Sequence, residues 1–388
     1  MRNPCLGALP PELADHELVT AAWQGLDAGK TWDCHAHLAG TGDSGSGIWT
    51  NPALESWWHP LQLAQRNFFL NAACAADGSE SQPAGSDRRY VMRLRDLAAA
   101  MRPGHKVMLL AFDAAYLEDG NIDLEHSAFL VSNDYAWRVA RGNPGRFEWA
   151  ASIHPYNPDC VTVLDAALKA GARAVKWLPA AQGIDPGSPR CDAFYEALAR
   201  HGLPLITHAG EERAVHGRAE PALGNPLLLR RPLEHGVRVV VAHCASMGSD
   251  IDLDRGPNAN PVESFTLFSR MMDEPKSEAL LFGDLSAMTQ VKRAGIPLST
   301  VIERSDWHPR LLNGSDYPLP GVMPLYSVEF MVERRYIDPA AAAPLSAIRR
   351  YNPLLFDFVL KRHLMSGGKR LSARVFETRD FFLSRPRA

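Results

Sequence analysis

The sequence predicts an α/β fold, namely a (β/α)8 TIM barrel. Short apolar segments rich in β-branched residues recur along the 388 residues, and each is followed by a turn and then a helix-like pattern. This alternation is typical of a parallel sheet covered by helices, and eight such units can close into a barrel. The candidate strands are residues 31–37, 105–113, 147–155, 172–179, 203–210, 237–246, 279–287 and 309–318.

The segments between the candidate strands predict the outer helices. Residues 161–172 and 192–202 have helical patterns, with Gly171 and Gly202 as expected C-caps. We expect a single domain over residues 1–388, with a barrel core over about residues 31–358. The C-terminal extension, residues 359–388, is expected to wrap the outside of the barrel or to mediate contacts.

The first two candidate strands are too far apart for one helix and a loop. Residues 38–104 are therefore predicted to form an insertion over the barrel mouth. Its aromatic-rich part, residues 48–72, is predicted to be a helical cap, either as an exposed lid or packed onto the barrel rim. Residues 76–89 are polar and rich in Gly, Pro and Ser, so a mobile loop is expected there.

Composition narrows the class of protein. A hydrophobic fraction of 46%, a charged fraction of 22% and a net charge of −3 are ordinary for a globular protein and do not favour nucleic acid or an anionic membrane as partner. No apolar run approaches the roughly 20 residues that span a bilayer, and no secretory signal is recognised. The 6 cysteines are sparse and form no CxxC motif, so we expect a reduced, cytoplasmic protein.

Polar residues recur where the candidate strands end. In a barrel these carboxyl ends open onto one face, where active sites of this fold lie. His35 and His37 are two residues apart on one strand and therefore point the same way. Neutral imidazoles with one carboxylate are typical of a catalytic zinc site, although a single histidine is more often structural. The strand-end residues are His35, His37, His154, Lys176, His208, His243 and Asp316.

Several strand-end motifs together resemble a known group of enzymes. The segments "DCHAH", "LITHAG", "VVVAHCAS", "FGDLSA" and "NGSDYP", with the ending "YNPLLFDF", are similar to successive motifs of the amidohydrolase superfamily. The resemblance is greatest to its amidohydrolase-related (amidohydrolase 2) branch of TIM-barrel metal-dependent hydrolases, and it covers residues 31–358. It implies a divalent metal, usually zinc, held by His35, His37, His208 and Asp316, with His243 near the attacking water and the substrate.

Two strand-end residues keep more than one interpretation. In dinuclear members of the superfamily, a carboxylated lysine or a glutamate on the fourth strand bridges two metals, and Lys176 lies in that region. Lys176 could instead face the substrate unmodified or pack outward, and we favour one Zn²⁺ per chain. His154 could reach the barrel mouth, and Glu211, Glu212 and Arg213 follow His208 on a loop expected to be solvated.

The resemblance implies hydrolysis of a C–O or C–N bond in a small molecule such as a lactone, ester or cyclic amide. A divalent metal would lower the pKa of its water toward roughly 7. Asp316 would take the proton of that water and pass it to the leaving group, and His243 would stabilise the oxyanion or orient the water.

Two other functions remain open. The first is non-oxidative decarboxylation of an aromatic or unsaturated acid, with Arg213 or Arg230 as carboxylate clamp, and the second is a non-catalytic metal-binding protein. Neither the substrate nor the oligomeric state follows from the sequence, although barrels of this size often form homo-oligomers.

Overall fold

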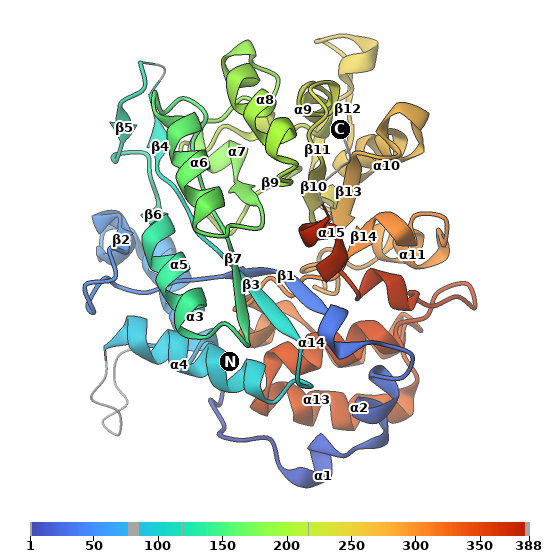
Figure 1. Cartoon of the computed structure of the whole chain (residues 1–388). Coiled ribbons are helices and arrows are strands. Elements are labelled where there is room, and N and C mark those ends of the chain that lie inside the picture. The colour runs from blue at the N-terminus through green and yellow to red at the C-terminus, as the bar shows by residue number, and fades with distance from the viewer. Residues whose placement is uncertain (1, 77–84, 118, 216, 385–388) are drawn as a thin grey trace.

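All eight predicted strands are present in the computed structural model, which describes residues 2–76, 85–117, 119–215 and 217–384 (Figure 1). They form two parallel sheets, ordered β1-β3-β7 and β14-β13-β10-β9-β8. The barrel strands are β1 (Trp32–His37), β3 (Lys106–Leu110), β7 (Phe147–Ala150), β8 (Val175–Trp177), β9 (Leu205–His208), β10 (Val239–Ala242), β13 (Leu281–Asp284) and β14 (Leu311–Leu312).

Backbone contacts join the two sheets at both pairs of edges. Between β7 and β8, the Lys176 N–H donates to the Ala151 carbonyl over 2.7 Å. Between β1 and the segment after β14, the Asp316 N–H donates to the His35 carbonyl and the His37 N–H to the Tyr317 carbonyl, each over 2.8 Å. The strands therefore follow one another in a ring, and the predicted TIM-barrel fold is confirmed.

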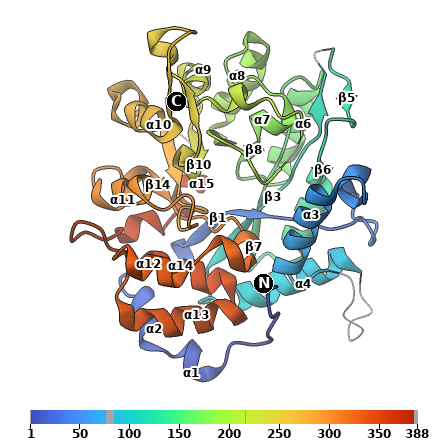
Figure 2. The same cartoon turned by 180° about the vertical axis from the view of Figure 1, so that it is seen from behind.

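Helices surround the strands, and both ends of the chain pack among them (Figures 1 and 2). The predicted C-caps are confirmed, since Gly171 and Gly202 adopt left-handed backbone angles of φ 89° and 61° just after their helices. The longer helices are α3 (Pro60–Ala72), α4 (Ser86–Ala99), α5 (Asn133–Gly142), α6 (Cys160–Lys169), α8 (Asp192–His201), α10 (Ser264–Asp273), α11 (Ile296–Glu303), α13 (Ala342–Tyr351) and α14 (Pro353–His363).

Short helices and strands lie outside the barrel and its longer helices. None of the helices in the described part of the chain combines the length and the apolar character needed to cross a bilayer. The remaining helices are α1 (Pro11–Ala14), α2 (Glu17–Ala22), α7 (Pro179–Gln182), α9 (Arg230–Glu234), α12 (Val328–Glu333) and α15 (Arg379–Leu383). The remaining strands pair as β2 (Trp49–Thr50) with β6 (Phe129–Leu130), β4 (Ala115–Tyr116) with β5 (Ile122–Asp123), and β11 (Ser249–Ile251) with β12 (Pro261–Glu263).

The barrel interior is filled by apolar side chains. The C-terminal extension closes the end of the barrel at which the strands begin. Residues of every barrel strand except β8, with Ala174 just before β8, form one inner cluster, which also holds Phe381 and Phe382 of α15. The ring of Phe382 stacks on Trp32, at the start of β1, with centroids 6.3 Å apart. Because the amino ends of the strands are plugged in this way, the opposite end is the one available for a site.

The predicted insertion, residues 38–104, contains two helices with different roles. Helix α4 buries Tyr90 and Leu94 in the main core, and the Leu97 carbonyl accepts from the Asn352 side chain over 3.0 Å. The mobile loop expected over residues 76–89 is wrong from Ser86 onward, because α4 begins there, whereas residues 77–84 lie outside the described residues.

The aromatic-rich segment that contains helix α3 is partly packed and partly exposed, so each of the two interpretations of the cap holds for one part of it. It buries Leu70 in the main core, and the Gln65 side chain donates to the Arg213 carbonyl over 3.0 Å on the loop after His208. Just before this helix, Trp57 and Trp58 are 87% and 91% exposed. The cap is therefore packed at one end and exposed at the other.

One pair of cysteines is oxidised, contrary to expectation. Cys5 and Cys74 form a disulfide in the structure, so the expectation that all cysteines are reduced is wrong for these two. The other cysteines, Cys34 and Cys244 among them, are buried free thiols, as expected for a reduced protein.

A buried ion pair on α14 supports the loop that carries Asp316. The Lys361 ammonium donates to the Gly314 carbonyl over 2.5 Å and to Asp357 over 2.6 Å, and both side chains are almost fully buried. Burial raises the pKa of Asp357 to about 7, although the Lys361 charge opposes that shift. The carboxylate therefore depends on Lys361 for compensation.

Replacing Lys361→Met is expected to lower the free energy of unfolding by about 3–5 kcal/mol, because it leaves Asp357 buried without its cation. Urea denaturation measures this change. The double variant Asp357→Leu with Lys361→Met should recover most of the loss, since an apolar pair removes the unpaired charge. A single variant as stable as the wild type would refute this assignment.

Candidate metal centre

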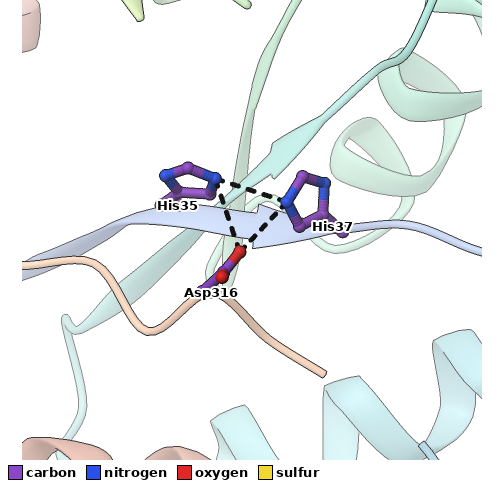
Figure 3. Close-up of side chains that lie close together, drawn as sticks. All are labelled: His35, His37 and Asp316. Atoms are coloured by element: carbon purple, nitrogen blue, oxygen red, sulfur yellow. Dashed lines mark hydrogen bonds and ion pairs between the residues drawn. The ribbon is translucent and has the colours of Figure 1, made fainter. Parts of the chain in front are cut away.

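Three predicted ligands converge at the carboxyl end of the barrel. His35 and His37 come from β1 and Asp316 from the loop after β14, and their side chains point toward one another (Figure 3). The two Nε2 atoms are 3.3 Å apart, and Asp316 Oδ1 lies 3.1 Å from His37 Nε2 and 3.6 Å from His35 Nε2. These ligand atoms lie close enough together to hold one metal ion.

Local backbone features bring these residues together. The pairing of β1 with β3 shifts register between Asp33 and Ala36, so Cys34 lies in the inner apolar cluster while His35 still turns toward the site. Gly314 allows close approach, because a Cβ there would lie 2.7 Å from the Cβ of His35. Asp316 itself has a left-handed φ of 62°. Such strain is typical of functional positions.

A carboxylate on the neighbouring strand sets the tautomer of His35. Asp284, at the end of β13, lies 2.8 Å from His35 Nδ1 and accepts its proton. The lone pair of His35 Nε2 is therefore directed toward His37 and Asp316. Burial and the Lys176 charge lower the pKa of His35, so the ring is neutral, the form that binds metals.

His243 is held by the same carboxylate in an unusual turn. His243, Cys244 and Ala245 have left-handed φ values of 54°, 51° and 49°, and the His243 N–H donates to Asp284 over 3.1 Å. Its Nδ1 donates to the Ser286 carbonyl over 2.9 Å, which leaves the Nε2 lone pair facing Asp316 Oδ2 at 3.9 Å. Burial and the Arg293 charge lower the pKa of His243 to about 3.

The residues present fit a divalent cation. His35 Nε2 and Asp316 are buried electron-rich groups directed at one point, and a cation compensates such a concentration of acceptors. Burial raises the cost of ionising Asp316, but His243, His37 and His35 outweigh it and hold the Asp316 pKa well below its usual range. The carboxylate is thus ionised, as a ligand must be.

A second group of ligand types, His35, His243 and Asp284, also lies within metal-binding distance. His35 Nδ1 already bonds to Asp284, His243 Nδ1 bonds to the Ser286 carbonyl, and the Ser286 hydroxyl donates to Asp284. This group therefore has the form of the outer hydrogen-bond layer that orients metal-binding histidines.

His208 lies at the site but outside the group formed by His35, His37 and Asp316. Its ring centroid is 5.4 Å from that of His243, at the end of β9. The buried Nε2 makes no hydrogen bond of good geometry, and its nearest acid is Glu212 Oε2 at 3.2 Å. An orphaned imidazole nitrogen fits a ligand, so the role of His208 stays a prediction.

Lys176 and His154 differ in their surroundings. The Lys176 ammonium on β8 is buried and lies 3.4 Å from His35 Nε2, and burial lowers its pKa. His154 instead accepts from the Tyr156 N–H over 3.2 Å and donates to the Gln182 carbonyl over 3.1 Å. Both ring nitrogens of His154 are thus used by the backbone.

Sequence reasoning missed Asp284, Ser286 and Arg293, and it expected Glu212 on a solvated loop. Glu212 is buried, where its carboxylate accepts from the Val215 N–H over 3.0 Å and lies beside His208. Asp284 carried a usable signal, because it stands at the carboxyl end of the seventh predicted strand within "FGDLSA".

A largely buried cluster of two histidines and an aspartate at the carboxyl ends of barrel strands is typical of metal-dependent enzymes of TIM-barrel fold. The chain belongs to the amidohydrolase family, because the model of that family, described as Amidohydrolase, matches residues 32–354. The resemblance inferred from the strand-end motifs is thereby confirmed. No curated protein is similar enough in sequence to count as a match.

Solved structures with related folds include an uncharacterized TIM-barrel protein from Bordetella bronchiseptica, with 16% identity and a TM-score of 0.49 over 86% of this chain and 99% of that chain. A 5-carboxyvanillate decarboxylase from Sphingomonas paucimobilis has 15% identity and a TM-score of 0.44 over 89% and 98%. A 4-oxalomesaconate hydratase from Rhodopseudomonas palustris has 16% identity and a TM-score of 0.42 over 91% and 97%. None of these similarities identifies the reaction.

Replacing Asp284→Asn is expected to weaken Zn²⁺ binding about 10- to 100-fold, because the amide no longer holds His35 in its metal-binding orientation. Competition with a chromophoric chelator measures the affinity. Asp250→Asn is the matched control, since Asp250, on β11, accepts from the Ser264 hydroxyl at the start of α10 and has no contact with the cluster among the described residues. Wild-type affinity in Asp284→Asn would contradict the role given to this carboxylate.

Proposed function

We propose that the protein is a metal-dependent hydrolase that cleaves a C–O or C–N bond in a small molecule such as a lactone, ester or cyclic amide. One Zn²⁺ per chain would be held by His35, His37, His208 and Asp316. The observation that carries the proposal is the orientation of Asp316, whose Oδ1 faces the two histidines of β1 while its Oδ2 faces His243.

A bound Zn²⁺ would polarise the scissile carbonyl and lower the pKa of water toward roughly 7. Asp316 is ionised and buried, so its Oδ2 is the group placed to take a proton from the attacking water and return it to the leaving group. The distance of 3.9 Å between Asp316 Oδ2 and His243 Nε2 allows one reacting oxygen to contact both atoms.

The two expected roles of His243 are not equally supported. Its Nδ1 proton is engaged by the Ser286 carbonyl, so the neutral ring has no proton on Nε2 with which to stabilise an oxyanion. His243 therefore orients the water by accepting its hydrogen bond. Lys176, with its buried ammonium beside His35, is the group that stabilises negative charge as it develops on the substrate oxygen.

The two arginines considered as carboxylate clamps, Arg213 and Arg230, do not support decarboxylation. Arg213 is paired with Glu211 over 2.7 Å on an exposed loop, and Arg230 is paired with Asp254 and Glu274. Neither guanidinium is available as a carboxylate clamp. Release of CO2 without consumption of water would nevertheless assign the decarboxylase in place of the hydrolase.

Replacing Asp316→Asn is expected to lower kcat about 10²- to 10⁴-fold, because the amide cannot carry the proton. The assay follows acid release from a panel of lactones, aryl esters and cyclic amides, with the zinc content measured in parallel. Asp165→Asn is the matched control, since that carboxylate pairs with His201 in a partly exposed ion pair. Full turnover in Asp316→Asn would overturn the mechanism.

A further inference from the structure

Helix α3 is attached to the rest of the molecule mainly at its C-terminal end. Within this helix only Leu70 and Ala72 are buried. Just before the helix begins, the side chains of Trp57 and Trp58 are almost fully exposed. A helix that buries so little of its surface depends for its position on the contacts at its packed end. Helix α3 is therefore built as a flap with its hinge at the C-terminal end.

One side of this flap contacts the loop that follows His208. Near the middle of α3, the Gln65 side chain donates to the carbonyls of Arg213 and Ala214. The same loop carries Glu212, which lies 3.2 Å from His208 Nε2 and accepts from the Ala214 N–H. The position of α3 is thus linked by two contacts to a predicted metal ligand.

The hinge end of α3 packs on the segment that follows Asp316. A Cβ at Gly321 would lie 2.5 Å from the Ala72 carbonyl oxygen, so the two backbones are in close contact. The Asn3 side chain joins them, because its Nδ2 donates to the Ala72 carbonyl over 3.0 Å and to the Gly321 carbonyl over 3.3 Å. The Leu319 N–H donates to the Asp316 carbonyl over 2.9 Å. The flap therefore extends from one ligand loop to another.

The disulfide lies at this hinge. Helix α3 ends in a Schellman motif, in which the Cys74 N–H donates to the Asn71 carbonyl over 3.0 Å and the Ala75 N–H to the Leu70 carbonyl over 2.7 Å. Cys74 occupies the left-handed position of the motif, where glycine is usual, with a φ of 56°. Its partner Cys5 also has a left-handed φ, of 51°. Both cysteines thus have a backbone conformation that is costly for a residue with a side chain.

A reductant can reach this bond, because Cys5 is exposed and Cys74 is half-buried. The segment that carries Cys5 has a separate attachment to α4, where Arg93 donates to the Leu6 carbonyl over 2.9 Å. The N-terminal end of the chain lies beside α4 in both views of the molecule (Figures 1 and 2). When the bond breaks, this segment keeps its contact with α4, whereas the hinge of α3 loses its covalent attachment.

We propose that the Cys5–Cys74 disulfide is a redox switch for the cap of the barrel mouth. In the oxidised chain, the bond holds α3 against the loops of His208 and Asp316. A dithiol reductant passes two electrons and two protons to the sulfur atoms, so that both cysteines become thiols while the reductant itself becomes a disulfide. Helix α3 then opens at its hinge and exposes the site. The inference rests on the proposed function for the reaction that the switch controls.

The test is amide hydrogen exchange, read by mass spectrometry, on the metal-free full chain before and after reduction with dithiothreitol. We expect the amides of α3 to exchange about 10-fold faster after reduction and those of α8 to be unchanged, because only α3 depends on this hinge. Cys5→Ser should show the fast exchange without reductant. The matched control is Cys160→Ala, which removes a buried free thiol of α6 and should respond to reductant as the wild type does.

The His37 side chain reports on access to the site, since it is 28% exposed in the oxidised chain. Its labelling by diethylpyrocarbonate should be about 3- to 10-fold faster in Cys5→Ser than in the wild type, because an open cap leaves the ring unprotected. Both measurements need neither metal nor turnover, so they decide on the switch separately from the hydrolase assay.

Equal exchange of α3 in the oxidised and reduced chains would overturn the inference. An increase in exchange that is shared by the barrel strands would also overturn it, because the bond would then be a general structural cross-link.

Discussion

The carboxylate of Asp284 is the group on which the rest of the site depends. It accepts from His35 Nδ1 over 2.8 Å and from the His243 backbone N–H over 3.1 Å, so one side chain at the end of β13 positions two histidines from different strands. Both rings consequently direct Nε2 toward Asp316. The orientation of the metal-binding nitrogens is thus fixed by hydrogen bonds from a residue that does not itself bind the ion.

The site concentrates features that destabilise a protein. Left-handed backbone at His243, Cys244, Ala245 and Asp316 costs free energy that the barrel must offset. The compensation lies in the apolar interior closed by α15 and in the Lys361 side chain that holds the Gly314 carbonyl. Natural proteins break local rules mainly where function requires it, and these positions follow that pattern.

Much of the barrel was predictable because apolar, β-branched segments typical of strands alternate regularly with segments of helical periodicity. His35 and His37 were predictable from their two-residue spacing, and Asp316 from its place after the last strand. The role of Asp284 was not, since it depends on which nitrogen of His35 it meets across 249 residues. The disulfide of Cys5 with Cys74 spans 69 residues, and the start of α4 at Ser86 lies in a segment whose composition favours a loop.

Two assignments required the packed structure. Glu212 has the local sequence of a solvated turn, but the fold places it beside His208. Arg293 is buried beside the turn of His243 through a bond to Ser246, a residue 47 positions away, and no local sequence pattern encodes that contact.

The most direct test of the account is anomalous diffraction at the zinc edge from crystals of the chain purified without chelator. The account predicts one peak per chain, within about 2.0–2.2 Å of the ligand atoms of His35, His37 and Asp316. A peak elsewhere, two peaks bridged by Lys176, or no peak after zinc is supplied would contradict a single metal ion as the centre of this site.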